Sequence, residues 1–166
     1  MNLLSRLKSE VGLMLRRPPK QQYAAICYRV RKKQGTYEVL LMTSRDTGRW
    51  VIPKGWPMVG KKAHAVAERE AYEEAGVKGK AEKEPFGFYH YRKALQTGLK
   101  ILVRVQVHLL EVETMSKNFP EKGSRRLEWV SPTEAAERVN EPELRELLLG
   151  FAQRAQPLPI VAAVRG

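Results

Sequence analysis

Three glutamates at helical spacing follow a loop bounded by glycines, and this stretch constrains the chain more than any other. Residues 55–77 have the sequence GWPMVGKKAHAVAEREAYEEAGV. A helix has 3.6 residues per turn, so Glu70, Glu73 and Glu74 fall on one helical face. Like charges at this spacing repel by a few tenths of a kcal/mol per pair, a penalty that a bound cation relieves. Oxygen ligands suit Mg²⁺ or Mn²⁺, so the pattern predicts a metal-binding helix.

A second interpretation of this helix is an ordinary amphipathic surface helix. Arg69 and Glu73 have the i,i+4 spacing of an ion pair, and Gly76 is typical of a C-cap. This interpretation explains neither the additional carboxylates nor the loop of glycine and proline that precedes them. We therefore favour the metal-binding interpretation.

The same stretch resembles the signature box of the Nudix hydrolases. That box is a glycine, five residues, a glutamate, seven residues, and then Arg-Glu-aliphatic-x-Glu-Glu-x-Gly-aliphatic. The positions that match are Gly55, Arg69, Glu70, Glu73, Glu74, Gly76 and Val77. Ala71 is a small apolar residue where the family has an aliphatic one, and Lys61 stands where the family has its first glutamate.

The resemblance continues outside the box, from Tyr23 to Val139 in pattern and spacing. Within the family the chain is most similar to the diphosphoinositol polyphosphate and diadenosine polyphosphate phosphohydrolases. The features that carry this similarity are residues 39–42, Arg45, Arg49 with Trp50, the box ending at Val77, and the stretch from Pro120-Glu121 to Glu128-Trp129.

The resemblance implies an α/β fold, the Nudix α/β/α sandwich with a mixed β-sheet between helices. Hydrophobic alternation agrees, because strand-like runs are interleaved with amphipathic helical segments. We expect strands within residues 23–30, 38–43, 86–92, 99–109 and 127–130. Two capping boxes, which begin at Ser131 and Asn140, predict two further helices, and residues 77–85 are expected to be a charged connection.

The length of 166 residues suits one domain. We expect an amphipathic basic extension over residues 1–19, a Nudix domain over 20–156 and a tail over 157–166. The extension has three interpretations that the sequence leaves open: a helix docked on the domain, a membrane-surface helix, or a transit-like leader.

A formal net charge of +12 favours a polyanionic partner: a phosphate-rich small molecule, a nucleic acid or an anionic membrane. The sequence has no apolar run long enough to span a bilayer. The single cysteine, Cys27, excludes an internal disulfide, so a reducing compartment, the cytoplasm, is expected. The spacing of His64, His90 and His108 does not suit a zinc site.

The resemblance implies that Glu73 and Glu74 are metal ligands and that Glu70 is either a ligand or the catalytic base. The carbonyl of Lys54 or Gly55 would complete the coordination. Arg69 is expected to brace the glutamates. Glu121 is a second candidate base, and its alternative role is to neutralise the positive charge of its neighbours Lys122, Arg125 and Arg126.

Basic residues before the glutamate helix are candidate contacts to substrate phosphates. Arg45 and Arg49 lie just ahead of it, and arginine offers a bidentate fork to phosphate oxygens, although both have surface charge as their alternative. Lys54 and Lys61 are assigned to the same group. Lys61 either contacts phosphate or simply fills the place of the glutamate that the family has there.

These features predict a Mg²⁺-dependent pyrophosphohydrolase, with Mn²⁺ as the alternative ion. The expected substrate is rich in phosphate, such as a dinucleoside polyphosphate or an inositol pyrophosphate, and water attacks phosphorus. The alternatives are a nucleotide-sugar or ADP-ribose pyrophosphatase and a catalytically weak module that binds nucleic acid. We favour the small-molecule partner over nucleic acid, leave membrane-surface binding open for the N-terminal helix, and leave the oligomeric state open.

Overall fold

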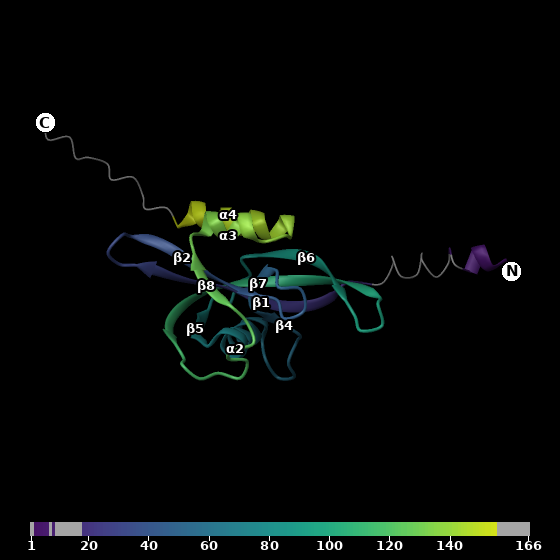
Figure 1. The fold of residues 1–166 in the computed structure, drawn as a ribbon, viewed down its shortest axis with the longest axis horizontal. Coiled ribbons are helices and arrows are strands. Elements are labelled where there is room, and N and C mark those ends of the chain that lie inside the picture. Colours follow the sequence, from purple (N-terminus) through teal and green to yellow (C-terminus); the bar gives the residue numbers. More distant parts are fainter. Residues whose placement is uncertain (1, 7, 9–17, 156–166) are drawn as a thin grey trace, which may run out of the picture.

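The structure is a computed structural model that describes residues 2–6, 8 and 18–155. Figure 1 shows a central sheet between two helical layers. The helices are α2 (Ala63–Ala75), α3 (Pro132–Arg138) and α4 (Pro142–Arg154). The strands are β1 (Lys20–Arg31), β2 (Thr36–Thr43), β3 (Trp50–Val51), β4 (Lys54–Gly55), β5 (Val77–Ala81), β6 (Gly87–Ala94), β7 (Lys100–Met115) and β8 (Leu127–Val130).

The sheet is mixed, and its centre is the parallel pair of β1 and β7, in which Ala24 lies opposite Val107. The main strand order is β3-β2-β1-β7-β5, while β4 pairs with β1, β6 with β7 and β8 with β2. All of these other pairings are antiparallel. With α2 on one face and α3 and α4 on the other, the predicted α/β/α sandwich is confirmed (Figure 1).

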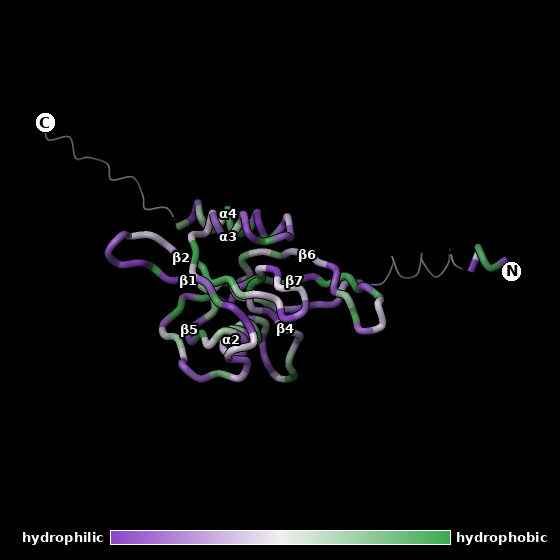
Figure 2. The backbone as a smooth tube through the Cα atoms, in the orientation of Figure 1, coloured by the Kyte–Doolittle hydropathy of each residue, from purple (hydrophilic) through white to green (hydrophobic). Residues whose placement is uncertain are grey.

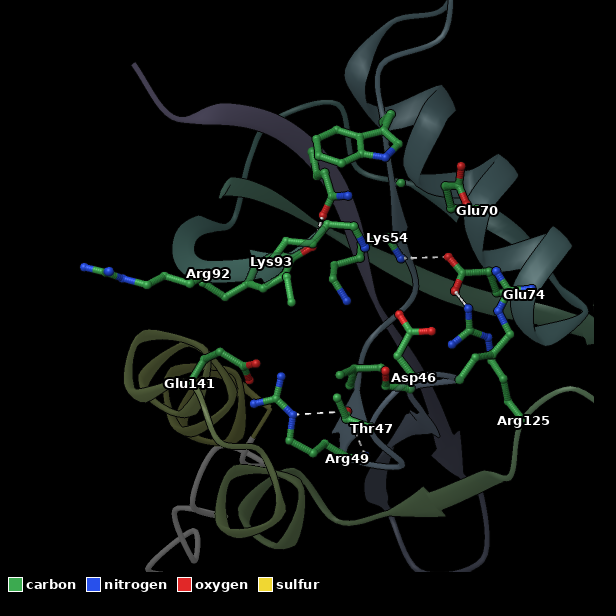
Figure 3. Close-up of a pocket in the computed structure, with 18 of the residues that line it drawn as sticks. Asp46, Thr47, Arg49, Lys54, Glu70, Glu74, Arg92, Lys93, Arg125 and Glu141 are labelled. Carbon is green, nitrogen blue, oxygen red and sulfur yellow. Dashed lines mark hydrogen bonds and ion pairs between the residues drawn. The ribbon is translucent and has the colours of Figure 1, made fainter. Parts of the chain in front are cut away.

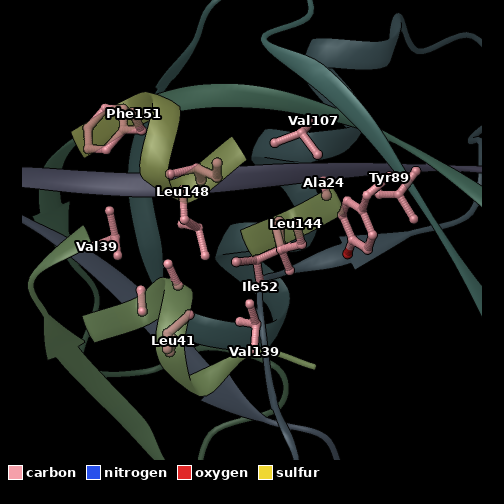
Figure 4. Close-up of a cluster of buried hydrophobic side chains, with 14 of the residues drawn as sticks. Ala24, Val39, Leu41, Ile52, Tyr89, Val107, Val139, Leu144, Leu148 and Phe151 are labelled. Atoms are coloured by element: carbon pink, nitrogen blue, oxygen red, sulfur yellow. The ribbon is translucent and has the colours of Figure 1, made fainter. Parts of the chain in front are cut away.

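Each face of the sheet packs against its own helical layer because side chains alternate along a strand. On β1, Ala24 and Ile26 join the core beneath α3 and α4, whereas Ala25 and Cys27 join the core beneath α2. Figure 4 shows the first core, in which residues of α4 lie over the strands. Residues 39–42 are all buried, as expected for a strand covered on both faces. Figure 2 shows that hydrophilic residues gather at the turn of the β1–β2 hairpin instead.

Residues 77–81 form a strand, so the prediction of a connection over 77–85 was wrong for its first part. Val77 and Ala81 are buried, while Lys78 and Lys80 face solvent. A β-carbon at Gly79 would lie 2.1 Å from the carbonyl oxygen of Glu111, so the strand needs a glycine at that point. Lysines on an edge strand are a common protection against further strand pairing, and here they concealed the strand in the sequence.

Only one of the two predicted capping boxes is formed. The Ser131 hydroxyl accepts a hydrogen bond from the backbone N–H of Glu134 at 3.2 Å, as a capping residue should. Asn140 is not a cap, because Glu141 occupies that position and no side chain caps α4. Glu143 instead accepts a hydrogen bond from the backbone N–H of His90 at 3.0 Å.

The predicted C-terminal tail, 157–166, lies outside the described residues, and so does most of the extension over 1–19. Within the described part of that extension, residues 3–6 are helical, and Leu3 and Leu4 are exposed. Among the helices that the structure describes, none has the length and apolar character needed to cross a membrane.

Candidate active site

A pocket of about 720 Å³ opens beside the glutamate helix α2. Its walls come from α2, the β4 turn, the loop after β2, the loop before β8, the β6–β7 hairpin and the start of α4. The predicted site residues that line it are Arg45, Arg49, Lys54, Gly55, Glu70, Glu74 and Glu121. Figure 3 shows Glu70 and Glu74 on one side and Glu141 across from them. The structure therefore gathers residues that are far apart in the sequence around one cavity.

Three predicted site residues do not line this pocket: Lys61, Arg69 and Glu73. Lys61 and Arg69 line a separate shallow hollow of about 530 Å³ on another face of α2. The Arg69 Nε atom donates a hydrogen bond to Glu73 Oε1 at 2.6 Å. The ion pair that the surface-helix interpretation expected is thus present, and it turns Glu73 towards Arg69.

Gly55 lies directly against the carboxyl group of Glu70. A β-carbon at position 55 would lie 2.1 Å from both Cδ and Oε1 of Glu70. Any other residue would therefore push the carboxyl group away from the β4 backbone. The position of the Glu70 carboxyl group against β4 therefore depends on the glycine at the start of the signature stretch.

Glu74 is 5% exposed and is held from two sides. Its Oε1 atom accepts a hydrogen bond from the backbone N–H of Lys54 at 3.2 Å. Its Oε2 atom forms an ion pair with Nη2 of Arg125 at 2.8 Å. Burial raises the pKa of Glu74 above its ordinary value, and the nearby Arg125 and Lys54 oppose that shift.

Arg125 is the residue that fixes Glu74, and sequence analysis treated it only as part of a basic cluster. Its side chain is 11% exposed, and Nη1 donates to the carbonyl of Thr43 at 3.1 Å. Thr43 lies 82 residues away in the chain. No local pattern marks a contact over that distance, so only the fold identifies the role of Arg125.

Glu70 and Glu74 act as a coupled carboxylate pair. Burial first, and then the charge of Glu74 and a hydrogen bond with it, raise the pKa of Glu70 to about 8. The interaction with Glu70 lowers the pKa of Glu74, which opposes the effect of burial. A cation bound between the two carboxyl groups would relieve the repulsion that raises the pKa of Glu70.

The chemistry of this pair fits a hard divalent cation, since carboxylate oxygens are the ligands that Mg²⁺ prefers. Among residues 2–6, 8 and 18–155, however, no group of three or more His, Cys, Asp or Glu side chains is gathered closely enough to hold a metal. Glu73 is turned to Arg69, and this accounts for the missing third side chain. Glu70 and Glu74 are thus the ligands that the pocket offers directly.

The raised pKa of Glu70 predicts that the metal-free protein loses stability as the pH rises from about 4.5 to about 8. Over this range the folded state keeps a proton that the unfolded chain has released, so folding weakens with rising pH. Thermal unfolding in chelator at pH 5 and pH 8 measures the effect. Glu70→Gln should remove most of this dependence, whereas an unchanged slope in that variant would show that Glu70 does not titrate as described.

Glu121 stands beside the carboxylate pair but is engaged by two arginines. Its Oε1 atom lies 3.3 Å from Nη1 of Arg45 and 3.4 Å from Nη2 of Arg125. Its backbone N–H donates to the carbonyl of Glu73 at 3.0 Å, which ties the loop to α2. These contacts suit an acid that neutralises neighbouring charge, and they also hold a proton acceptor at the pocket wall. Both roles therefore stay open.

The pocket contains more charged residues than the sequence analysis named. Arg92, Lys93 and Lys100 line it because the antiparallel pairing of β6 and β7 places Lys93 opposite Ile101 and Ala94 opposite Lys100. Glu141 lines it from the N-terminus of α4. Arg49, which was predicted, is steadied by a hydrogen bond from its Nε to the Thr47 hydroxyl at 3.2 Å.

Cys27 and His108 have structural environments. Cys27 is fully buried, and burial raises the pKa of its thiol above the ordinary value. His108 is also buried, with Nδ1 2.8 Å from the carbonyl oxygen of Glu82, and burial lowers its pKa. These surroundings agree with the prediction that neither residue carries the chemistry.

Comparison of the sequence with protein families and curated proteins finds clear relatives. The model of the NUDIX domain matches residues 20–151. Nudix hydrolase 21, chloroplastic, from Arabidopsis thaliana is 31% identical over 137 residues, which are 81% of this chain and 67% of that protein. Diphosphoinositol polyphosphate phosphohydrolase 3-alpha from Homo sapiens is 42% identical over 62 residues, which are 37% of this chain and only 36% of that protein.

Solved structures share the fold. A crystal structure of C. elegans Ap4A hydrolase covers 84% of this chain and 100% of its own, with a TM-score of 0.59 and 19% identity. The NUDIX domain of Shewanella oneidensis NrtR, complexed with ADP ribose, covers 94% and 100%, with a TM-score of 0.61 and 12% identity. At such identities the likeness concerns the fold, and it agrees with the sandwich described above.

Proposed function

Because this chain belongs to the Nudix domain family, we propose that it is a Mg²⁺-dependent hydrolase of phosphoanhydride bonds in a polyphosphate-rich substrate. The observation that carries the proposal is the carboxylate pair, half-buried Glu70 and buried Glu74, in a pocket lined by arginines and lysines. Carboxylates bind the cation and basic side chains bind phosphate, so the pocket has the two components that the reaction needs.

The cation, when bound, would neutralise phosphate charge and lower the pKa of a water molecule. Glu70 and Glu74 would hold it, with the carbonyl of Gly55 and, after release from Arg69, Glu73 as further ligands. Arg125 keeps Glu74 in place through its ion pair. Mn²⁺, with similar oxygen preferences, is the alternative ion.

The protein residues also account for the transfer of the proton and the positioning of the phosphates. As the oxygen of water bonds to phosphorus and the bridging oxygen leaves, the proton of water passes to Glu121, or to Glu70 where Glu70 is the base and not a ligand of the cation. Arg45 and Arg49, at the pocket wall, hold the outer phosphates through their planar guanidinium groups. Lys54, whose amine lies 5.2 Å from the centre of the Tyr91 ring, adds charge between the two sides of the pocket.

We propose a dinucleoside polyphosphate or an inositol pyrophosphate as the substrate. The names of two relatives, an Ap4A hydrolase and a diphosphoinositol polyphosphate phosphohydrolase, support this class. The basic side chains from the β6–β7 hairpin extend the cationic lining away from the carboxylate pair, which suits a long phosphate chain. The ADP ribose of the NrtR complex supports the alternative, a shorter diphosphate substrate.

We expect kcat/KM to rise from dinucleotides bridged by two phosphates to those bridged by five or six. Each added phosphate meets further positive charge in the pocket, and salt weakens this attraction as the Debye length falls from about 10 Å at 0.1 M to about 3 Å at 1 M. Steady-state kinetics on a series of chain lengths at two salt concentrations tests the proposal. Faster turnover of a two-phosphate substrate at low salt would exclude the polyphosphate substrate class. The proposal that the chain is a phosphoanhydride hydrolase would still stand.

Three variants locate the charge responsible for this preference. Arg45→Ala should reduce it, because Arg45 lines the pocket, whereas Lys83→Ala, an exposed lysine outside the pocket, serves as the control. Lys61→Ala tests the expectation drawn from the sequence for that residue. Since Lys61 lies outside the pocket, its loss should cost less of the preference than the loss of Arg45.

The net charge of +12 favours a second candidate function, a non-catalytic module that binds nucleic acid. The carboxylate pair speaks against it, because a module that only binds nucleic acid has no need of grouped carboxylates in its pocket. Turnover with Mg²⁺ decides between the two functions. Membrane-surface binding through the N-terminal extension is compatible with either, and a liposome pull-down of the full chain tests it.

A further inference from the structure

Glu141 places a further carboxylate in the pocket, across from Glu70 and Glu74 (Figure 3). Its Oε2 atom is buried and has no hydrogen-bond partner within the part of the chain that the structure describes. Its charge is felt inside the pocket: burial raises the pKa of Tyr91 to about 12, and Glu141 adds to that shift. Glu141 lines the pocket while this oxygen has no partner among the described residues, so the carboxylate group is available to accept a hydrogen bond from a bound molecule.

The α4 helix does not need the Glu141 side chain. Glu141 is the N-cap residue of α4 but makes no side-chain capping bond. Pro142 at the first helical position already favours the helix start, and the Glu141 backbone carbonyl accepts from Arg145 at 3.0 Å whatever the side chain is. A buried acceptor without a partner destabilises the fold, so the carboxylate serves another purpose.

The chemistry of the group that would satisfy Glu141 is limited. A phosphate is disfavoured because two anions repel, and among the described residues no group of three or more His, Cys, Asp or Glu side chains lies close enough to hold a metal here. Lys54 lies between Glu141 and Glu74 and makes no ion pair within 4.0 Å with either carboxylate. An uncharged or cationic N–H or O–H donor of the substrate is the remaining partner.

The aromatic lining of the pocket suits a nucleoside. Trp56, which is 41% exposed, and Tyr91 line the same pocket and offer aromatic surface to a planar base. A nucleoside also carries ribose hydroxyls and, in adenine, an amino group. A ring that is phosphorylated at every position has no such donor.

We propose that Glu141 accepts a hydrogen bond from the nucleoside part of the substrate and so makes the pocket select nucleoside polyphosphates over fully phosphorylated rings. This proposal rests on the hydrolase function proposed above and decides between the two substrate classes named there. It divides the pocket into a phosphate side, with Glu70, Glu74 and Arg45, and a nucleoside side, with Glu141.

The test compares diadenosine pentaphosphate with an inositol pyrophosphate that has no free hydroxyl. Loss of a charge-assisted hydrogen bond should lower the ratio of the two kcat/KM values about tenfold or more in Glu141→Ala and less in Glu141→Gln. Glu146→Gln, an exposed glutamate on α4, is the matched control and should leave the ratio unchanged. The melting temperature of Glu141→Ala should not fall, because the side chain makes no hydrogen bond or ion pair with the described residues.

Two further substrates identify the donor. If a ribose hydroxyl is the partner, the wild type turns over a deoxyribose analogue more slowly than the parent substrate, whereas Glu141→Ala turns over the two at the same rate. If the base amine is the partner, an analogue without that amine gives this result and the deoxyribose analogue does not. An unchanged ratio in Glu141→Ala, or an equal loss on both substrate classes together with a lower melting temperature, would overturn the proposal.

Failure of the hydrolase proposal gives a different result. If the folded wild type hydrolyses neither substrate, that proposal fails by itself. The role of Glu141 is then decided by ligand-induced rises in melting temperature, since a ligand that binds only the folded state stabilises it. Diadenosine pentaphosphate should stabilise the wild type more than Glu141→Ala, and equal stabilisation would overturn the inference.

Discussion

Replacing Glu74 with glutamine should lower the Mg²⁺-dependent kcat by about a hundredfold or more while the protein stays folded. Glutamine keeps the size of the side chain and an acceptor for the Lys54 N–H. It removes the negative charge that a divalent cation requires of its ligand. Loss of the cation removes several kcal/mol of transition-state stabilisation. Kinetics at saturating substrate, with circular dichroism to confirm folding, measure the effect.

The matched control for this variant is Glu137→Gln, an exposed glutamate on α3. It should leave kcat within about twofold of wild type, because surface changes away from special features have small effects. Mg²⁺ should also raise the melting temperature of the wild type more than that of Glu74→Gln. Turnover above a tenth of wild type in Glu74→Gln would contradict the assignment of this residue as a metal ligand.

Arg125→Ala should lower the free energy of unfolding of the metal-free protein by about 3 kcal/mol or more. The variant leaves the Glu74 carboxylate buried without the Arg125 guanidinium that pairs with it. Removing one partner of a buried ion pair costs about 3–5 kcal/mol. The Thr43 carbonyl also loses a donor. Urea unfolding at pH 8 and pH 5 measures the change. The loss should be smaller at pH 5, since the raised pKa of Glu74 lets a proton replace the missing charge.

The adjacent Arg126→Ala is the control for that measurement. Arg126 is exposed and lies over the Trp50 ring at 5.6 Å, so its loss should cost well under 1 kcal/mol. Two results would show that the ion pair with Glu74 contributes little to the free energy of unfolding. One is equal destabilisation by the two variants, and the other is a loss of stability in Arg125→Ala that does not change with pH.

The fold was predictable where local periodicity matched the environment. The alternation over 99–109 gave β7, and the helical spacing of the glutamates gave α2. The strand β5 was missed because its lysines face solvent and its glycine is explained only by the approach of β7. Likewise, Asn140 has the sequence of a cap but lies one residue before the true N-cap.

The candidate site was predictable as far as helix geometry determines it. Spacing placed Glu70 and Glu74 on one face, and both line the pocket, but spacing could not show that Glu73 turns towards Arg69. Arg125 acts through contacts with residues distant in sequence, and Glu141 reaches the pocket only because the fold brings the start of α4 there, so no local motif marks either residue. Lys61 was assigned to phosphate by its nearness in sequence to the glutamates, yet it lies in the loop before α2 and lines the separate hollow with Arg69.

The most direct test of the account is the rate of phosphoanhydride hydrolysis by the wild-type chain across a Mg²⁺ titration, with diadenosine pentaphosphate as substrate and products resolved by chromatography. The account predicts turnover that saturates with Mg²⁺, disappears in chelator and returns when Mg²⁺ or Mn²⁺ is added back. Turnover that persists unchanged in chelator would contradict it. So would the absence of turnover by the folded protein, with either ion, on dinucleoside polyphosphates, inositol pyrophosphates, nucleotide sugars and ADP-ribose alike.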